Sequence, residues 1–304
     1  MDHRGQRFQG CLLGLAVGDA VGTTLEFRKR GTFEPITDMA GGGPFRLKPG
    51  QWTDDTSMAL CLAHSLLAAG FDPRDQMQRY SRWRREGYMS SNGRCFDIGT
   101  TVSEALHRYA NTGDPFAGST NPFAAGNGSL MRLAPVAMYY SPDIDSVIHY
   151  CGESSRTTHA AAECIDACRY FGSILHLAFS GADKAALLAG DLYRPETPKV
   201  AAIATGGYLA KSPDNISGSG YVIDCLEASL WCFAHTENFR EAILMAANLG
   251  DDADTTAAVC GQLAGAHYGL GGIPEDWLNK ITMKDDMLAL SLQLYSAEPD
   301  LAAR

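Results

Sequence analysis

The sequence Gly250-Asp251-Asp252-Ala253-Asp254-Thr255-Thr256 lies between two apolar runs, 242–249 and 257–266. Apolar runs of this kind are typical of helices, so the stretch marks the start of the second helix. Asp and Thr at a helix start can accept hydrogen bonds from its free N–H groups, and one or two acids satisfy that need. A third acid adds like-charge repulsion unless a cation lies among the carboxylates. The stretch therefore predicts either helix capping or a cation site.

A second stretch has the same composition. Trp52-Thr53-Asp54-Asp55-Thr56 also precedes an apolar helical run, 58–67. For either stretch alone, helix capping is the favoured interpretation. Two such helix starts, one near each end of the chain, favour a single site to which both contribute carboxylate and hydroxyl oxygens, the ligands of hard divalent cations.

The segment before the second stretch supplies further acids and a packing surface. Residues 8–22 have the composition of a buried helix, in which Gly14, Gly18 and Gly22 recur every four residues. Because each glycine costs about 1 kcal/mol in a helix interior, three in a row predict the close approach of another helix. Asp19 and Glu26 are acids in and beyond this apolar element. Burying them is expensive, unless each partners a cation or caps a backbone.

Composition narrows the class of protein. The chain has 304 residues, 45% of them hydrophobic, and a net charge of −10. This length suits one large domain or two smaller ones. The negative charge and the absence of dense Lys/Arg runs argue against nucleic acid as the main partner. The apolar N-terminal segment is interrupted by Gly14, Gly18 and Asp19, so we expect no membrane span.

The cysteines indicate the compartment. Nine cysteines, an odd number, are scattered without a Cys-x-x-Cys motif, and several lie in apolar helical runs. They are typical of buried free thiols in a reducing compartment. We therefore expect a cytoplasmic protein.

Helical spacing recurs along the whole chain, and we find neither strand alternation nor a fixed-period repeat. The prediction is an all-α fold, a compact bundle of about ten helices or more. Because the two acidic stretches need each other, we predict one domain spanning residues 1–304, and we expect a monomer. Further helices are predicted over 54–69, 73–87, from just after Asp97 to about 109, 130–139, 143–156, 159–180, 198–210, 221–233, 238–249 and 287–295.

Several other residues carry weaker local signals. Asp97 precedes a helix that runs to about Tyr109, and locally it is best interpreted as the N-cap. His159 stands at a helix start, where a structural role is the usual one. Tyr221 has the spacing of a core residue. The glycine-rich loop 31–51 is either a wall of the site or a connector. The run Gly126-Asn127-Gly128-Ser129 before an expected helix is either an anion site of free N–H groups or a common turn.

Taken together, the motifs resemble the ADP-ribosylglycohydrolase family, and within it the dinitrogenase reductase-activating glycohydrolase type. The resemblance runs in order from about residue 8 to residue 269. The paired Thr-Asp-Asp and Asp-x-Asp-Thr motifs are highly specific together, whereas the glycine patches are not. The matching pieces are Gly14 to Gly22 with Glu26, Thr53-Asp54-Asp55-Thr56, Phe96-Asp97-Ile98-Gly99, Gly126-Asn127-Gly128-Ser129-Leu130-Met131-Arg132, Thr158-His159, Tyr221-Val222-Ile223-Asp224 and Asp252-Ala253-Asp254-Thr255-Thr256.

The resemblance implies an orthogonal multi-helix bundle with two divalent cations, Mg²⁺ or Mn²⁺, at one end. The implied cation ligands are Thr53, Asp54, Asp55, Asp252, Asp254 and Thr255, and the implied catalytic residues are Asp97, Glu26 and Asp55. The implied substrate contacts are Asp97 beside the ribose, Gly126, Asn127, Gly128 and Ser129 over the ribose and phosphates with His159 nearby, and Tyr221 on the adenine.

Two residues depart from the family pattern. Ser129 stands where relatives often have Ala, and Asp251 follows Gly250 where many have a second Gly. Asp251 is therefore open to two interpretations, an additional acid behind the ligands or a helix cap.

The implied activity is hydrolysis of the bond between C1″ of ADP-ribose and a protein side chain, so the implied partners are ADP-ribose and an ADP-ribosylated protein. The Phe96-Asp97-Ile98-Gly99 motif follows the arginine-directed branch, which makes ADP-ribosyl-arginine the leading substrate. Serine-linked ADP-ribose, an ADP-ribosyl small molecule and immunity to a toxin stay open. So does a non-catalytic relative, although the intact acidic motifs argue against it. A two-metal phosphohydrolase is weaker, because His-rich ligand sets are missing.

Overall fold

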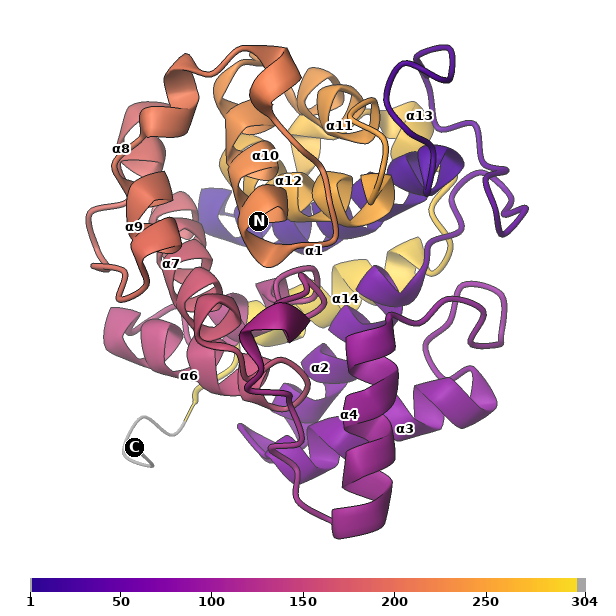
Figure 1. Ribbon diagram of the computed structural model, residues 1–304, viewed down its shortest axis with the longest axis vertical. Helices are drawn as coiled ribbons and strands as arrows, with labels where there is room; N and C mark the ends of the chain where they lie inside the picture. The colour runs from indigo at the N-terminus through magenta and orange to yellow at the C-terminus, as the bar shows by residue number, and fades with distance from the viewer. Residues whose placement is uncertain (1, 300–304) are drawn as a thin grey trace.

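The computed structural model describes residues 2–299, which form fourteen α-helices and no β-strand within that range. The all-α prediction is confirmed. Figure 1 shows the helices crossing one another around the central pair α1 and α12. The helices are α1 (His3–Gly22), α2 (Asp54–Ala69), α3 (Pro73–Glu86), α4 (Thr100–Thr112), α5 (Ala134–Tyr139), α6 (Ile144–Arg156), α7 (Ala162–Phe179), α8 (Lys184–Ala189), α9 (Pro198–Ala204), α10 (Val222–Ala234), α11 (Phe239–Ala247), α12 (Ala253–Tyr268), α13 (Glu275–Leu278) and α14 (Lys284–Tyr295).

The glycine stripe of α1 packs directly on α12, as the spacing predicted. A Cβ atom placed on Gly14 would lie 2.2 Å from the carbonyl oxygen of Gly261, and one on Gly18 would lie 2.1 Å from that of Ala257. At Gly22 the nearest oxygen is that of Ala253, at 2.3 Å. Since residue numbers fall on α12 as they rise on α1, the two helices are antiparallel. This arrangement sets the C-terminal end of α1 beside the N-terminal end of α12.

Helix α1 is longer than the sequence indicated, because it begins at His3, where the side chain of Asp2 accepts a hydrogen bond from the Gly5 N–H. The segment His3–Leu25 is long and apolar enough to pass a test for membrane-spanning helices, against the expectation that it is too interrupted. However, 94% of its apolar window is buried inside the protein, which is the situation of a core helix. The hydrophobic core continues from Phe8 of α1 to Leu294 of α14.

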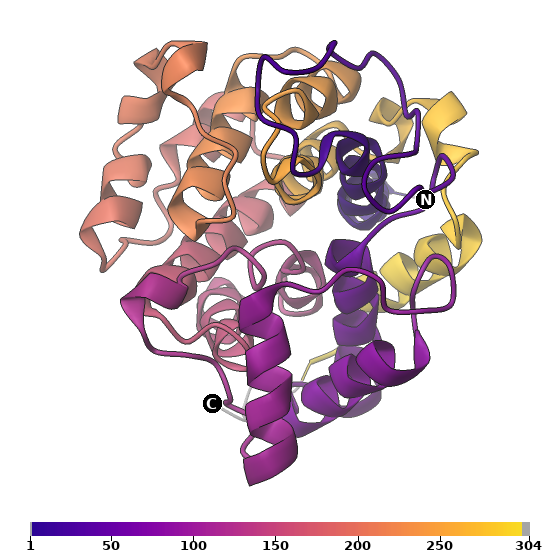
Figure 2. The same cartoon turned by 45° about the vertical axis from the view of Figure 1, so that its right-hand side comes forward.

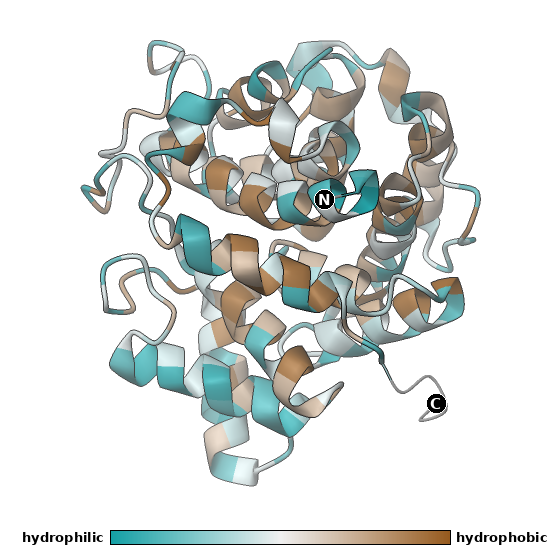
Figure 3. Cartoon of the chain, turned by 180° about the vertical axis from the view of Figure 1, so that it is seen from behind, coloured by the Kyte–Doolittle hydropathy of each residue, from teal (hydrophilic) through white to brown (hydrophobic). Residues whose placement is uncertain are grey.

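Several element boundaries differ from prediction. Residues before Ala134 form turns, so α5 begins four residues later than expected. The helix predicted over 198–210 is divided into α9 and a 3-10 helix, Gly207–Ala210, because Gly206 between them is left-handed with φ 74°. The short helices α8 and α13 were not predicted. Figure 3 shows apolar residues on the helices throughout the bundle and a more hydrophilic α3.

The cysteines are free thiols, as predicted. Eight of the nine are buried and Cys95 is half-buried. Burial raises the pKa of these thiols, for example that of Cys168 to about 11, so they stay protonated.

Candidate active site

A cavity of about 690 Å³ opens where α2, α4 and α12 begin and α1 ends. Figure 2 shows α4 in front of this region, with the loops that follow α1 at the upper right. Most of the predicted site residues line the cavity. Its walls are formed by Glu26, Phe27, Asp54, 97–102, 126–128, Met131, His159, Ser219, Gly220, Asp251, Asp252, Asp254 and Thr255.

The two acidic helix starts meet on one side of this cavity. The Thr53 hydroxyl lies 3.3 Å from Asp254 Oδ2, and the Thr255 hydroxyl lies 3.2 Å from Asp55 Oδ1. All of these residues are buried. The antiparallel packing of α1 on α12 and the position of α2 beside the end of α1 therefore bring both ends of the chain to one place.

Helix α2 receives its N-terminal cap from α1. The buried carboxylate of Asp19 accepts hydrogen bonds from the backbone N–H groups of Thr53 (2.9 Å) and Thr56 (3.1 Å). It also accepts from both threonine hydroxyls, at 2.9 and 2.7 Å. Of the two roles that the sequence left open for Asp19, the backbone cap is the one observed.

Helix α12 is capped in the same manner. Glu26 Oε2 accepts hydrogen bonds from the N–H groups of Ala253 (2.9 Å) and Asp254 (3.4 Å). The residues at the N-cap positions themselves, Thr53 for α2 and Asp252 for α12, make no capping hydrogen bond with their side chains. The local interpretation of the acidic stretches as helix caps is therefore wrong for the two N-cap residues, because Asp19 and Glu26 accept the capping hydrogen bonds. Within the stretches, Asp254 Oδ1 accepts a hydrogen bond from the Thr255 N–H at 2.7 Å, and the other carboxylate oxygens are available for a cation.

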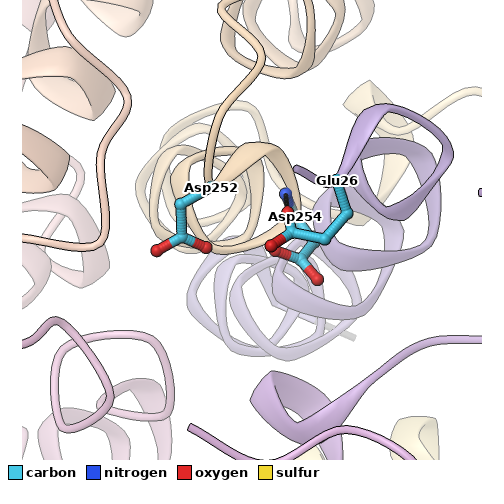
Figure 4. A group of neighbouring side chains, drawn as sticks. All are labelled: Glu26, Asp252 and Asp254. Atoms are coloured by element: carbon cyan, nitrogen blue, oxygen red, sulfur yellow. Dashed lines mark hydrogen bonds between the residues drawn. The ribbon is translucent and has the colours of Figure 1, made fainter. Parts of the chain in front are cut away.

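These acids are crowded and shielded from water. Oxygen atoms of Glu26, Asp252 and Asp254 lie within 4.8 Å of one another, and Figure 4 shows the Glu26 and Asp254 carboxylates side by side. Burial, followed by neighbouring negative charges, raises the pKa of Asp54, Asp55 and Asp254 well above the usual range. Buried Asp55 Oδ2 has no hydrogen-bond partner. Carboxylates and hydroxyls in this state fit hard divalent cations, which would supply the missing positive charge.

Asp97 also faces this group. It lines the cavity as a half-buried residue, and the N-cap of α4 is Gly99, so the local prediction that Asp97 caps the helix is wrong. Burial, followed by the charges of nearby aspartates, raises the pKa of Asp97 to about 7. Burial likewise raises the pKa of Glu26 to about 8, with the Asp252 carboxylate adding to the effect. Two carboxyl groups that titrate near neutral pH can exchange protons with a substrate.

The loop 126–129 forms the opposite wall, and three of its four residues line the cavity. The Asn127 amide donates to Asp252 Oδ2 at 2.8 Å, which ties the loop to α12. The Asn127 N–H donates to the Gly220 carbonyl, so this group is already satisfied, and no helix starts at residue 130 to leave a set of free N–H groups. Ser129 lies behind the wall, where its hydroxyl accepts a hydrogen bond from Ser155 at 2.8 Å.

The ring of His159 lies against this loop. It is buried, lines the cavity, and contacts the Thr158 hydroxyl through Nδ1 at 2.8 Å. Burial, together with the charge of Arg132, lowers the pKa of His159 to about 3, so its ring is neutral at physiological pH. A Cβ atom on Gly128 would lie 2.7 Å from His159 Cε1, which explains why a glycine is found there.

Tyr221 lies in a neighbouring hollow of about 530 Å³. The prediction from helical spacing that it is a core residue is confirmed only in part, because Tyr221 packs against the hydrophobic core but its ring is half-buried and lines this hollow. Its hydroxyl donates to Glu163 and accepts from Lys199 Nζ at 2.7 Å. Residues Thr101, Gly126 and Gly220 line both spaces, so the hollow continues the cavity.

Sequence reasoning missed Phe27 at the cavity rim and left the role of Asp251 open. Both are left-handed, with φ 61° and 57°, and Asp251 is exposed and does not cap α12. The loop 31–51 does not line the cavity, but its Phe45 packs between Phe27 and Phe96, with ring centroids 6.1 and 5.3 Å apart. The sequence carries no signal for Phe27, whereas a non-glycine residue after Gly250 could have pointed to Asp251.

The raised pKa values predict how stability depends on pH when divalent cations are removed. The folded protein holds protons on Glu26 and Asp97 that the unfolded chain has already released, so the free energy of unfolding falls as pH rises toward 8. The low pKa of His159 makes the free energy of unfolding rise with pH, but only below about pH 6.5. With a chelator, we expect the melting temperature to fall by about 4 °C between pH 6.5 and 8.

Added Mg²⁺ should remove most of this fall, because a cation favours ionised carboxylates. Differential scanning fluorimetry with and without Mg²⁺ measures both curves. A melting temperature that rises with pH in the presence of chelator would contradict the assignment.

Fold and site together define an all-α protein with a carboxylate-lined cavity, and known hydrolases resemble it over nearly its whole length. The family model for ADP-ribosylglycohydrolase matches residues 1–302. The ADP-ribosylarginine hydrolase Tri1 of Pseudomonas putida (strain GB-1) is 46% identical, over 97% of this chain and 79% of the relative. The ADP-ribosyl-[dinitrogen reductase] glycohydrolase of Rhodospirillum rubrum is 34% identical, over 91% of both.

A solved structure of an ADP-ribosylglycohydrolase-related protein complex has a TM-score of 0.87 and 46% identity, and covers 97% of this chain and 99% of the matched chain. The chain belongs to the ADP-ribosylglycohydrolase family. The resemblance recognised in the sequence motifs is thereby confirmed.

Proposed function

We propose that this protein hydrolyses the N-glycosidic bond between C1″ of ADP-ribose and an arginine side chain of a modified protein, and so reverses mono-ADP-ribosylation. The observation that carries this proposal is the meeting of Asp54 and Asp55 with Asp252 and Asp254 in one buried group, while Asp19 and Glu26 accept hydrogen bonds from the N–H groups at the two helix starts. Relatives named as hydrolases of ADP-ribosylated arginine and dinitrogen reductase support it.

We propose that two divalent cations, Mg²⁺ or Mn²⁺, are held by Thr53, Asp54, Asp55, Asp252, Asp254 and Thr255. Glu26 is close enough to Asp252 and Asp254 to join the ligands of one of them. When bound, the cations would orient the ribose hydroxyls and lower the pKa of a water molecule. Two hydrogen bonds position the proposed cation ligands. The Thr53 hydroxyl donates to Asp19, and the Asn127 amide donates to Asp252.

The chemical step needs one water and one proton transfer. The C1″–N bond breaks with its electron pair going to the guanidine nitrogen, which gains a proton, and the hydroxyl group of the water joins C1″. Asp97 and Glu26 are the candidates for moving this proton, because both carboxyl groups line the cavity beside the proposed cation ligands and can reach a bound substrate. Asp55 and its neighbours meet the positive charge that develops at C1″.

In this proposal ADP-ribose occupies the cavity of about 690 Å³ and the hollow of about 530 Å³ together. In this proposal the ribose that carries the aglycone lies against Asp97 and the loop 126–128, the phosphates pass Gly126 and Gly220, and the adenine packs on Tyr221. Gly126 and Gly220 leave backbone without side chains at the passage between the two spaces. Lys199, whose ammonium lies 5.0 Å from the centroid of the Tyr221 ring, forms an ion pair with Glu163 at 3.3 Å in the hollow.

The direct test is an ADP-ribose release assay. The protein is incubated with arginine-linked and serine-linked ADP-ribosylated proteins, with Mg²⁺, with Mn²⁺ and with a chelator. We expect release from the arginine linkage that depends on the cation. Binding of ADP-ribose without release from either linkage would identify a non-catalytic relative instead.

Changing Asp97 to Asn tests its proton-transfer role. The amide keeps the shape of the carboxylate but cannot exchange a proton, so we expect turnover to fall by about 100-fold or more, while the dissociation constant of ADP-ribose changes by less than about threefold. Steady-state kinetics and calorimetry measure the two quantities. Equal turnover in the variant would remove Asp97 from the mechanism and leave Glu26.

We further propose that residues 1–304 act as one domain and as a monomer in the cytoplasm. The continuous hydrophobic core from α1 to α14 supports a single domain. The free thiols suit a reducing compartment, and Cys164 and Cys168 share a face of α7. Modified proteins and ADP-ribose are the expected partners, and we expect neither nucleic acid nor a membrane to be a main partner.

A further inference from the structure

Two side chains at the cavity rim take no part in the network of carboxylates and threonines. The Asp251 carboxylate is exposed and makes no hydrogen bond or ion pair with any residue between 2 and 299. The Phe27 side chain is 67% exposed, although it belongs to one of the most apolar residue types. Both line the cavity. An unpaired charge and an exposed ring at the mouth of an active site are available to a substrate.

The backbone holds these two residues together. The Phe27 N–H donates to the Asp251 carbonyl at 2.8 Å, and the Asp251 N–H donates to the Arg28 carbonyl at 2.8 Å. Both residues are left-handed without being glycine, which costs about 1–2 kcal/mol each. Each also precedes or follows a member of the carboxylate group, since Glu26 is next to Phe27 and Asp252 is next to Asp251. The fold thus fixes this pair beside the reacting centre.

The pair lies away from the end of the cavity that leads to Tyr221. The residues shared with that hollow are Thr101, Gly126 and Gly220, and neither Phe27 nor Asp251 lines it. With the adenine in the hollow and the ribose over the carboxylates, the group attached to C1″ must leave by another part of the rim. Phe27 is supported there by Phe45, which itself rests on Phe96.

An arginine aglycone is chemically complementary to Asp251 and Phe27 at this rim. Its guanidinium is planar and positively charged, pairs strongly with carboxylates, and packs over aromatic faces. A serine aglycone has neither a positive charge nor a planar group. We infer that Asp251 and Phe27 receive the guanidinium of the substrate and determine the preference for arginine. This inference rests on the proposed function, because it assigns the specificity of the same reaction.

The test separates recognition of the aglycone from recognition of ADP-ribose. Asp251→Asn and Asp251→Gly are compared with wild type, and Asp285→Asn, an exposed acid on α14 that does not line the cavity, is the matched control. We expect kcat/KM on ADP-ribosyl-arginine to fall about tenfold in both Asp251 variants, mainly through KM, while the dissociation constant of free ADP-ribose changes by less than about twofold.

The glycine variant excludes backbone strain as the cause. Glycine adopts the left-handed conformation without penalty, so Asp251→Gly should melt no lower than wild type and yet lose the same factor in kcat/KM. Phe27→Leu should lose about two- to fivefold on the same substrate, the effect of removing one cation–π contact, and Phe27→Trp should restore it.

The outcomes are distinct. If Asp251→Asn changes kcat/KM and ADP-ribose affinity by the same factor, or changes neither, the inference is overturned while the proposed function stands. If the wild-type protein binds ADP-ribose but releases none from ADP-ribosyl-arginine, the proposed function fails and the inference fails with it.

Discussion

Replacing Asp254 by Asn is expected to lower ADP-ribose release by at least about 1000-fold, and Asp54→Asn should have an effect of the same size. Each change removes a negative charge from the cluster of buried aspartates. The repulsion between these carboxylates is offset only when cations are bound. Titration calorimetry with Mn²⁺ should show that at least one binding event is lost in each variant. Thr255 and Thr53, which contact Asp55 and Asp254, remain in place, so the change is confined to charge.

The same variants should be more stable than wild type when a chelator is present. Burial and the neighbouring carboxylates raise the pKa of Asp254 and Asp54, so ionising them in the metal-free protein is costly, and an amide avoids this cost. Asp285→Asn on α14 is the control, since this exposed acid lies outside the cavity. Full activity together with unchanged Mn²⁺ binding in Asp254→Asn would show that the acidic helix starts do not hold the cations.

The convergence of the acidic stretches could be predicted from the sequence because it follows from a local excess of charge. Asp251, Asp252 and Asp254 are one acid more than a helix start needs, and Asp54 and Asp55 repeat the pattern at a second helix start, so this surplus is visible without a structure. The register that brings them together was not predicted. It depends on Gly14 and Gly18 meeting Gly261 and Ala257, a pairing between helices at opposite ends of the sequence.

The identity of the true caps could not be derived for the same reason. Asp19 and Glu26 were open to either a cation or a backbone partner, and the choice depends on which helix ends lie beside them. At Asp97 the sequence led to the opposite error, because a cap was predicted and the residue does not cap a helix. It stands before a helix, but α4 starts at Thr100 with Gly99 at its N-cap, which leaves the carboxylate to the cavity. Local spacing likewise cannot distinguish a core tyrosine from one, such as Tyr221, that lines a hollow.

The fold itself should fail if the glycine stripe is filled. In Gly18→Ala the new Cβ would lie 2.1 Å from the Ala257 carbonyl oxygen and 2.5 Å from its carbon, both backbone atoms that no side-chain rotation can move. Helices α1 and α12 must separate, so we expect a loss of more than about 3 kcal/mol in the free energy of unfolding, and a melting temperature lower by about 5 °C or more. Urea unfolding and calorimetry measure these quantities.

The matched control is Gly271→Ala in the 3-10 helix Leu270–Gly272, where a Cβ meets no atom within 4 Å and the expected change is below about 0.5 kcal/mol.

Cation binding at the site should respond to Gly18→Ala as well. Separating the helices lengthens the hydrogen bonds from Ala253 and Asp254 to Glu26, so α12 loses its cap where the carboxylates meet. Protein that remains folded at low temperature should therefore bind Mn²⁺ more weakly than wild type. Wild-type stability in Gly18→Ala would mean that the two backbones are not in contact, and the route by which α1 carries Asp19 and Glu26 to the site would have to be abandoned.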